Sequence, residues 1–499
     1  MYTLIVVLLI LGSLTPVIGY QEVQSSNQRL LRTEVNQKEL PALAQMTDDL
    51  DPLVDIEVTV DIISIRLLDD IDHPLNPDFF VKVFINSEEF LSPVWIDSPY
   101  LYDIHWTATL NVPDNIEYVD ILIGVYDNRS FGTSDTAQGY TAAMNYSIKT
   151  GHWTGNDSIG DPSGYGRLNS CDGAGSANQS EWDCELWFNI YQTDYDGDTI
   201  PYWTEVYTYG TDPMIDNTGE DFDLDLIPVE WEFKWLYNPS AWENHAQLDS
   251  DSDSLTNVEE YRMSSFGSDP YRRDLYIEID VMAQGPQGQN SSVPPYSKDL
   301  FRTVFDRRNI VCHLDDGCMG GGGDIIPFDE KTDRNDLRNI YKNYFLHNDS
   351  TNWRRSVFRY VNIVYQLFNG GSIAYVGEHP WFYWHAQGIN TNVICVQRIY
   401  ERSQKYNITI EFIFACMMMH ETGHTFGFDF LFPAGCDNGQ TDKPYNLLYW
   451  IFKNYKSCMN YRYMLYILDY SDGTHGLFDH DDWSGLDFSF FEKKNNGYC

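Results

Sequence analysis

The stretch HETGHTFG, residues 420–427, contains two histidines four positions apart. Side chains at i and i+4 share one face of an α-helix, so a helix here would let His420 and His424 hold one Zn²⁺ together. Glu421 is offset by one position, which carries its carboxylate past the metal toward a bound water. Zinc lowers the pKa of such a water to roughly 7 and polarises a carbonyl, which is the chemistry of peptide-bond hydrolysis. The stretch therefore predicts a zinc peptidase site with Glu421 as the general base.

A simpler interpretation is a buried helix whose histidines are ordinary satisfied polar groups. The preceding residues 412–418 are almost all apolar, so this helix would bury three ionisable side chains together. Moving an ionisable group from water into an apolar interior without a partner costs on the order of several kcal/mol per group. A metal ion supplies the missing partner, and the zinc interpretation is the better one.

A second motif, Ser457-Cys458-Met459-Asn460-Tyr461, follows about thirty residues later. With HExxHxxG, it makes residues 273–499 resemble the metzincin clan of zinc endopeptidases. The resemblance implies that Gly427 lets the chain turn sharply out of the helix and that Met459 lies beneath the metal as a hydrophobic floor. Ser-x-Met-x-Tyr is further similar to the astacin and serralysin forms of this turn. It implies that Tyr461 binds zinc or stabilises the tetrahedral intermediate.

The chain departs from the family at the third zinc ligand. The family's third ligand falls three residues after the glycine, where this chain has Phe430, which cannot ligate a metal. We expect the adjacent Asp429 to take that role, because carboxylate is an acceptable zinc ligand. Asp437, His475 and His480 are the alternatives. The same departure motivates a rival hypothesis, a catalytically inactive calcium-binding surface or adhesion protein with a decayed peptidase domain.

Strands alternate with helices in the part of the chain that carries the zinc motif, and this pattern predicts an α/β domain with the site on its final helix. A serine cap is expected at the start of the first helix. The predicted elements are a strand at 274–282, an amphipathic helix at 297–308, strands at 309–314 and 359–366, a short glycine-bounded edge strand at 370–377, and the zinc helix at 410–427. Beyond residue 468 we expect a surface loop and a final amphipathic helix, and the alternative is that the polar segment 468–473 lines the cleft or holds another calcium ion.

Residues 191–272 contain an acidic repeat with the ligand spacing of EF-hand calcium loops. Three Asp-x-Asp-x-Asp triplets each have a glutamate at loop position 12, where a calcium loop places its bidentate carboxylate. The predicted calcium ligands are Asp194, Asp196, Asp198 and Glu205, then Asp221, Asp223, Asp225 and Glu232, then Asp249, Asp251, Asp253 and Glu260. Apolar residues fill position 7, and the usual glycine at position 6 is absent. The region resembles thrombospondin type 3 repeats.

Between residues 51 and 190, short segments of alternating apolar and polar residues are separated by Pro, Gly, Asn and Asp. Period-two segments at this spacing predict an antiparallel β-sandwich, which loosely resembles a C2 domain. Strands are expected at 56–62, 80–85, 106–110 and 119–125. The overall prediction is a multidomain α+β protein: a β-sandwich, a calcium-repeat region at 191–272 and a metzincin-like α/β domain at 273–499.

The N-terminus and the composition indicate an exported protein. Residues 1–19 are uncharged with an apolar run, which predicts a signal peptide, and residues 20–50 form a polar linker or pro-segment. An uncleaved anchor at the cell surface is the alternative. Nine cysteines fit an oxidising compartment, and seven N-x-S/T sequons fit a glycoprotein. The suggested disulfide pairs are Cys171–Cys184, Cys312–Cys318 and Cys436–Cys458. A net charge of -42 disfavours nucleic acid as a partner and favours divalent cations. The expected partners are protein or peptide substrates.

Overall fold

The computed structural model describes residues 49–68, 76–128, 142–157, 162–168, 184–240, 244–368, 373–375, 390–429 and 432–491. The chain separates into two compact units, Met1–Thr47 and Asp48–Cys499. The predicted signal peptide and nearly all of the linker or pro-segment lie outside the described residues, so these two predictions stay untested. The described helices and strands all lie in the second unit.

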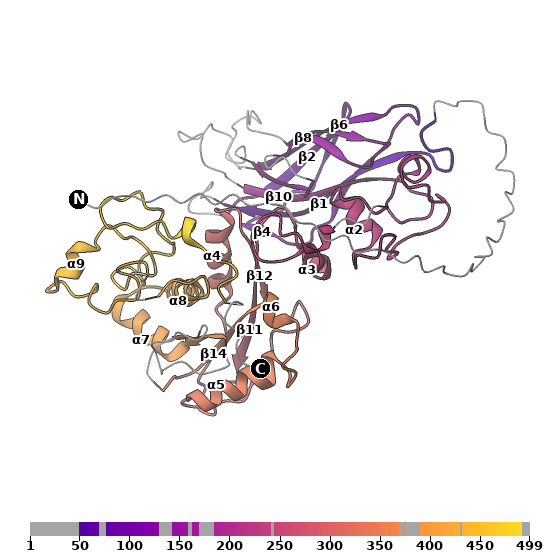
Figure 1. The fold of residues 1–499 in the computed structure, drawn as a ribbon. Coiled ribbons are helices and arrows are strands. Elements are labelled where there is room, and N and C mark those ends of the chain that lie inside the picture. The colour runs from indigo at the N-terminus through magenta and orange to yellow at the C-terminus, as the bar shows by residue number, and fades with distance from the viewer. Residues whose placement is uncertain are drawn as a thin grey trace, which may run out of the picture. The chain divides into compact units, whose positions relative to one another are not determined.

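The first part of this unit consists of two antiparallel sheets, as the alternating pattern predicted (Figure 1). One sheet has the order β4-β1-β10-β9, with β5 also paired to β1, and the other has the order β3-β2-β6-β7-β8. The strands are β1 (Glu57–Leu67), β2 (Phe79–Ile85), β3 (Glu88–Leu91), β4 (Tyr100–Leu101), β5 (Trp106–Asn111), β6 (Tyr118–Asp127), β7 (Ala142–Ser147), β8 (Trp153–Asn156), β9 (Tyr165–Leu168) and β10 (Cys184–Gln192). Alternate residues of β2 and β6, such as Val81, Val83, Ile121 and Ile123, join one buried apolar core.

The acidic repeat folds into loops that are each followed by a short helix. The helical segments are α1 (Tyr202–Thr204), η1 (Glu205–Tyr209), α2 (Val229–Lys234), η2 (Asn244–Gln247), α3 (Asn257–Met263) and η3 (Ser264–Phe266). A capping box begins α3, in which the Thr256 backbone and hydroxyl donate to the Glu259 carboxylate. Position 12 of each loop therefore falls at or within the helix that closes the loop.

A mixed sheet of order β12-β11-β14-β16-β15 forms the next part, with β13 paired to β11. Its strands run parallel except β15, which pairs with β16 in the antiparallel direction at the edge. The strands are β11 (Asp274–Met282), β12 (Val311–Asp315), β13 (Ile325–Ile326), β14 (Arg359–Val364), β15 (Ile373–Tyr375) and β16 (Thr391–Cys395). The predicted strands and the predicted edge strand are confirmed, within a residue or two at their ends for the described positions.

Helices pack around this sheet, and α8 is the central one for the site. It lies against α4 and α7, and it also contacts β15 and β16. The helices are α4 (Pro295–Asp306), α5 (Arg334–Ile340), η4 (Tyr341–Phe345), α6 (Arg354–Val357), α7 (Val396–Tyr406), α8 (Ile410–Thr425), α9 (Leu447–Ile451) and η5 (Trp483–Gly485). The prediction that the chain combines antiparallel sheets with a mixed α/β part is confirmed.

Two local predictions in this part are wrong. The first helix begins at Pro295, not at a serine cap, and the Ser297 hydroxyl instead donates to the Pro294 carbonyl over 2.5 Å. A proline suits the first helical turn because its missing N–H would have no partner there. The final amphipathic helix is also absent from the described residues up to 491, where only the single turn η5 follows residue 468.

The structure corrects two of the three suggested disulfides. Cys312, Cys318, Cys436 and Cys458 are free thiols. Cys312 is buried in the apolar core under α4, whereas Cys318 is exposed in the following loop. Cys436 and Cys458 are both buried among apolar side chains of the core around α8. Cys184 is disulfide-bonded, but its expected partner, Cys171, lies outside the described residues. The other two suggested pairs rested on closeness in sequence, which does not guarantee the geometry that a disulfide requires.

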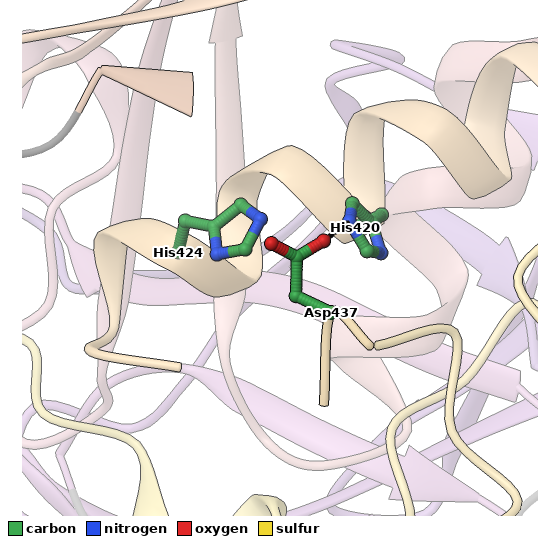
Figure 2. Close-up of side chains that lie close together, drawn as sticks. All are labelled: His420, His424 and Asp437. Carbon is green, nitrogen blue, oxygen red and sulfur yellow. Dashed lines mark ion pairs between the residues drawn. The ribbon is translucent and has the colours of Figure 1, made fainter. Parts of the chain in front are cut away.

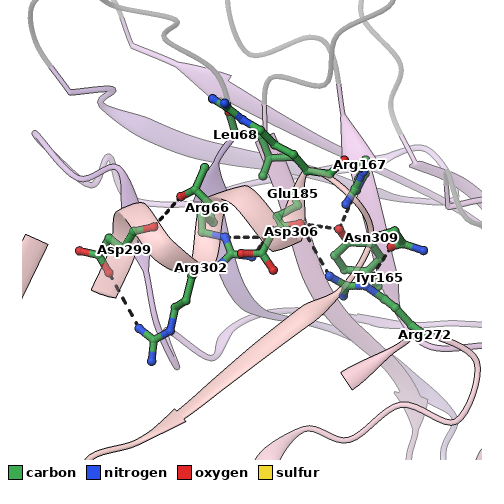
Figure 3. A network of polar contacts seen from close by, with 12 residues as sticks. Arg66, Leu68, Tyr165, Arg167, Glu185, Arg272, Asp299, Arg302, Asp306 and Asn309 are labelled. Carbon is green, nitrogen blue, oxygen red and sulfur yellow. Dashed lines mark hydrogen bonds and ion pairs between the residues drawn. The ribbon is translucent and has the colours of Figure 1, made fainter. Parts of the chain in front are cut away.

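A buried network of charges joins β1 and β10 to helix α4 (Figure 3). Arg66 pairs with both Glu185 and Asp306, and the Tyr165 hydroxyl donates to Glu185. Arg272 lies 3.8 Å from Glu185. The side chains of Arg66, Glu185 and Asp306 are at most 7 % exposed, so each charge depends on its partners for compensation.

Candidate functional site

The two histidines of the motif lie on one face of α8, as the four-residue spacing predicted. Their ring centroids are 5.0 Å apart and the rings are nearly perpendicular, at 89°. The Thr409 hydroxyl caps the first turn of the helix. At the other end Gly427 has φ +99°, a left-handed conformation that ends the helix at little cost because glycine has no Cβ. The predicted turn at Gly427 is confirmed.

Each imidazole is oriented by a backbone carbonyl. His420 Nδ1 lies 2.9 Å from the Cys458 oxygen, and His424 Nδ1 lies 2.6 Å from the Phe428 oxygen. A carbonyl can only accept, so Nδ1 of each ring carries a proton and Nε2 is the nitrogen left to face a metal. Metal-binding histidines are commonly held this way, which fixes the tautomer and the ring orientation. Both rings are therefore prepared to bind a metal through Nε2.

Asp437 is the acidic residue that completes this group. One ligand atom each from His420, His424 and Asp437 lies within 4.8 Å of the others. Figure 2 shows the carboxylate between the two rings, and Oδ1 is 3.5 Å from His420 Nε2. Burial disfavours its charge, but the hydrogen bond with His420 and the two imidazoles lower the Asp437 pKa to about 2. Two nitrogens and a carboxylate oxygen form a donor set that fits zinc.

The structure brings Asp437, one of the alternatives, into one group with the two histidines, whereas the choice of Asp429 as the third ligand stays a prediction. Asp429 forms a bridge with Phe432, and its carboxylate accepts the Phe432 N–H over 3.1 Å. This tight turn between Asp429 and Phe432 comes shortly after Gly427. Asp437, further along the chain, lies in the group with His420 and His424. Phe430, the residue at the family's ligand position, lies outside the described residues.

His475 and His480, which the sequence also offered as third ligands, have acidic partners elsewhere. His475 lies 3.0 Å from Asp479 and 3.7 Å from Asp472. His480 lies 3.3 Å from Asp482.

Met459 lies buried beside α8, where the family resemblance placed it. A Cβ added to Gly423 would lie too close to the Met459 sulfur, so the turn and the helix pack closely here and a larger residue would force the Met459 side chain to shift. The Ser457 hydroxyl accepts the Met459 N–H over 3.1 Å, and Asn460 donates to the Tyr455 carbonyl over 2.9 Å. These contacts fix the turn beneath the histidines.

Glu421 and Tyr461 lie together with His420 along a cleft of about 1010 Å³. The Tyr461 ring is 5.6 Å from the His420 ring, and its hydroxyl is hydrogen-bonded to Asp437. Burial, together with the charge of Asp437, raises the Tyr461 pKa well above its usual value. The phenol therefore stays protonated and can donate a hydrogen bond. A carboxylate and a phenol thus lie beside the group of His420, His424 and Asp437.

The cleft also has a basic wall that the sequence motifs did not reveal. Its lining includes Arg398, Arg402, Lys405, Lys443 and Arg462, against the acidic Glu401, Glu421 and Asp442, in a chain with a net charge of -42. Burial and the neighbouring Arg398 lower the Arg402 pKa, and the charge of Glu421 acts in the opposite direction. These cations come from α7 and from two later loops, and no local sequence pattern joins them.

The three acidic loops repeat in their geometry as well as in their sequence. At position 6, Thr199, Leu226 and Ser254 all have positive φ, between +74° and +86°. Each of these backbone N–H groups donates to the aspartate at position 1 of its loop, over 2.9 to 3.1 Å. The loops therefore make the EF-hand turn without its usual glycine, although a left-handed conformation costs such residues on the order of 1–3 kcal/mol.

Carboxylates converge in these loops and are poorly compensated. One group brings together Asp194, Asp196, Asp198 and Glu205, and another brings together Asp249, Asp251 and Asp253. Oδ2 of Asp196 and Oε2 of Glu205 are buried without a hydrogen-bond partner among the described residues. Burial raises the pKa of Glu205 to about 8. Oxygen-only groups of this kind fit calcium.

The second loop differs from the other two. Its group contains Asp223, Asp225, Glu232 and His245. Asp221, predicted as a ligand, is not in this group, although it accepts backbone N–H groups of Leu224 and Leu226 much as the first aspartates of the other two loops accept theirs. The sequence motif did not include His245, although it is the one histidine in residues 191–272.

Comparisons with known proteins give no family for this chain. No family model matches, and no curated protein matches. Among solved structures, a C2 domain of plant extended synaptotagmin 1 has a TM-score of 0.20 at 13% identity, covering 28% of this chain and 95% of that one. Human GIVD cytosolic phospholipase A2 has a TM-score of 0.18 at 13% identity, covering 28% of this chain and 16% of that one. Likenesses this low support no inference about fold or function. The chain spans about a sixth of the phospholipase.

The described residues contain no helix that is long and apolar enough to cross a membrane.

Proposed function

We propose that this protein is a zinc-dependent endopeptidase of the metzincin type that acts on proteins or peptides. The observation that carries the proposal is the convergence of His420, His424 and Asp437 beside Glu421 and Tyr461, above a buried Met459. A helix motif and a turn separated by some thirty residues meet at one point of the fold. A buried structural histidine pair would not require a neighbouring general base, an acidic third member and an open cleft.

In this mechanism, His420, His424 and Asp437 would hold the zinc ion. A zinc ion bound there lowers the pKa of a coordinated water to roughly 7 and polarises the substrate carbonyl. Glu421 accepts a proton from the attacking water and later gives that proton to the leaving amine. Tyr461 donates a hydrogen bond to the oxygen on which negative charge develops. The basic wall of the cleft favours peptides with acidic side chains, because each desolvated carboxylate there would meet a cation.

Calcium bound to the first and third acidic loops supplies the stability of the repeat region. The buried carboxylates there lack compensation, and a cation that binds only the folded chain stabilises it by mass action. The N-terminal segment supports export, and cell-surface attachment is the alternative to secretion. The repeat region would suit an extracellular setting, where calcium is abundant.

The Glu421→Gln variant tests the catalytic proposal. It keeps the size of the side chain and removes its basicity, so we expect bound zinc to remain while kcat falls by about 10²–10⁴-fold. The measurement is cleavage of a peptide library by the full chain, with metal content determined in parallel. Unchanged turnover in the variant would eliminate Glu421 as the base. A parent protein without stoichiometric zinc or cleavage would favour the rival hypothesis, an inactive calcium-binding surface protein.

A further inference from the structure

The second acidic loop contains a nitrogen ligand among its carboxylates. His245 belongs to η2, thirteen residues after Glu232, yet its ring lies inside the loop's ligand group. The described groups of the first and third loops contain carboxylates alone. The second loop therefore offers a different donor set from its two neighbours.

The imidazole is fixed in this position. His245 Nε2 lies 2.9 Å from Glu232 Oε1 and 3.1 Å from Asp225 Oδ2. The ring stacks on Tyr237, with centroids 4.7 Å apart and an angle of 14° between the planes. The side chains of His245 and Glu232 are 2 % and 0 % exposed. A ring held on its face by an aromatic neighbour cannot easily turn away from the carboxylates.

Several oxygens around this nitrogen are buried and poorly satisfied. Both carboxylate oxygens of Asp223, Oδ2 of Asp225 and Oε2 of Glu232 have no hydrogen-bond partner among the described residues, and the Asp225 oxygen has only its ion-pair contact with His245. Buried polar atoms in native proteins are almost always paired, and a buried unpaired charge is especially costly. One ligand atom from each of Asp223, Asp225, Glu232 and His245 lies within 4.8 Å of the others, and a cation among these atoms would supply a partner.

We propose that this loop is a mixed nitrogen and oxygen site for a zinc-class divalent ion, formed by Asp223, Asp225, Glu232 and His245, and that it prefers such an ion to calcium. Calcium takes oxygen ligands, whereas imidazole suits zinc and its neighbours in the first transition row. Two ligands that each bind one zinc ion at ~2.0–2.1 Å lie roughly 3.0–3.4 Å apart. The two short distances from His245 Nε2 are close to this separation.

A protonated His245 acting as a built-in cation is the competing explanation. With all three carboxylates of the group ionised, one imidazolium leaves two negative charges uncompensated in a buried site. A divalent ion bound with a neutral imidazole leaves only one uncompensated negative charge. Uncompensated buried charge is strongly destabilising, so the metal-bound arrangement is the better match to this group. The proposal is independent of the peptidase function and of the histidines on α8.

The test uses the full chain carrying His420→Ala, His424→Ala and His475→Ala, which removes the imidazoles of the site on α8 and of the group formed by Asp472, His475 and Asp479. Zinc is added to metal-free protein in the presence of millimolar calcium, and bound zinc is counted by equilibrium dialysis. We expect one zinc equivalent that His245→Gln weakens by more than about 100-fold, since loss of even an outer-shell partner costs about 10–100-fold. Glu232→Gln, on a different helix, should weaken the same equivalent. His152→Gln, a histidine that stacks on Phe233, is the matched control and should retain it.

A second readout does not depend on the folding of any variant at the site. Cobalt added in place of zinc to the same full chain should give visible absorption bands that persist in excess calcium and vanish when zinc is added. Displacement of the cobalt by millimolar calcium would overturn the proposal, and so would zinc binding that is the same in the parent, His245→Gln and Glu232→Gln proteins. Absence of any bound zinc equivalent would favour the built-in imidazolium.

Discussion

The backbone N–H of Asp437 donates to the carbonyl oxygen of Met459 over 2.9 Å. The next residue back along the turn, Cys458, accepts from His420 Nδ1. One turn of the chain therefore positions both a histidine and the acidic member of the metal group. Asp437, although far beyond the expected spacing, therefore lies close to the two histidines because it is attached to the same turn.

The first prediction compares the two candidate third ligands. Asp437→Asn should weaken zinc binding by more than about 100-fold, because even outer-shell partners contribute about 10–100-fold. Asp429→Asn is the matched control and should keep zinc, since Asp429 accepts a backbone N–H from Phe432. Zinc affinity measured by competition with a chromophoric chelator distinguishes them. The reverse ranking would restore Asp429 as the ligand.

The second prediction concerns Tyr461. Tyr461→Phe removes the hydroxyl that is hydrogen-bonded to Asp437. If this hydroxyl stabilises the oxyanion, kcat should fall by about 10²–10³-fold, the usual effect of losing one such donor, while KM and zinc content change little. Tyr463 lines the same cleft, but its hydroxyl donates to the Lys453 carbonyl. Tyr463→Phe should therefore keep most of the activity, and an equal loss in both variants would argue for a general effect on the cleft.

The third prediction addresses the buried charge network. Arg66→Ala leaves Glu185 and Asp306 short of a partner inside the protein. Removing one member of a buried ion pair typically costs about 3–5 kcal/mol of the free energy of unfolding. Lys149→Ala breaks a half-exposed pair with Glu117 and should cost no more than about 1 kcal/mol. Urea denaturation of the full chain measures both, and equal effects would show that the network contributes little.

The sequence predicted the parts of the site that depend on local geometry. The histidine pair on α8 follows from the helical period, and the left-handed turn follows from Gly427. It could not rank Asp437 above Asp429, because the answer depends on where the chain returns after a tight turn at Asp429 and Phe432. His245 was missed because it lies outside the twelve-residue loop pattern and joins the second loop only through tertiary packing.

The fourth prediction links the acidic repeat to pH. In the metal-free chain, burial raises the pKa of Glu205 and of Glu232 from 4.5 to about 8. Between these values the folded chain holds protons that the unfolded chain has released. The free energy of unfolding of metal-free protein should therefore fall as pH rises from about 5 to 8. Divalent cations favour the ionised carboxylates, so their addition should raise the melting temperature most at pH 8.

Thermal melts of dialysed protein at several pH values, with and without calcium and zinc, measure this effect. Other groups also titrate in this window, and the Glu205→Gln/Glu232→Gln double variant separates their contribution. Its amides cannot take up protons, so the pH dependence of the metal-free protein should become shallower in the variant, and the gain from added metal should shrink. The prediction would be contradicted if the metal-free parent became more stable toward pH 8 and the double variant showed the same slope. That result would mean that ionisation of these two buried glutamates does not destabilise the folded chain. The loops would then need no cation to fold.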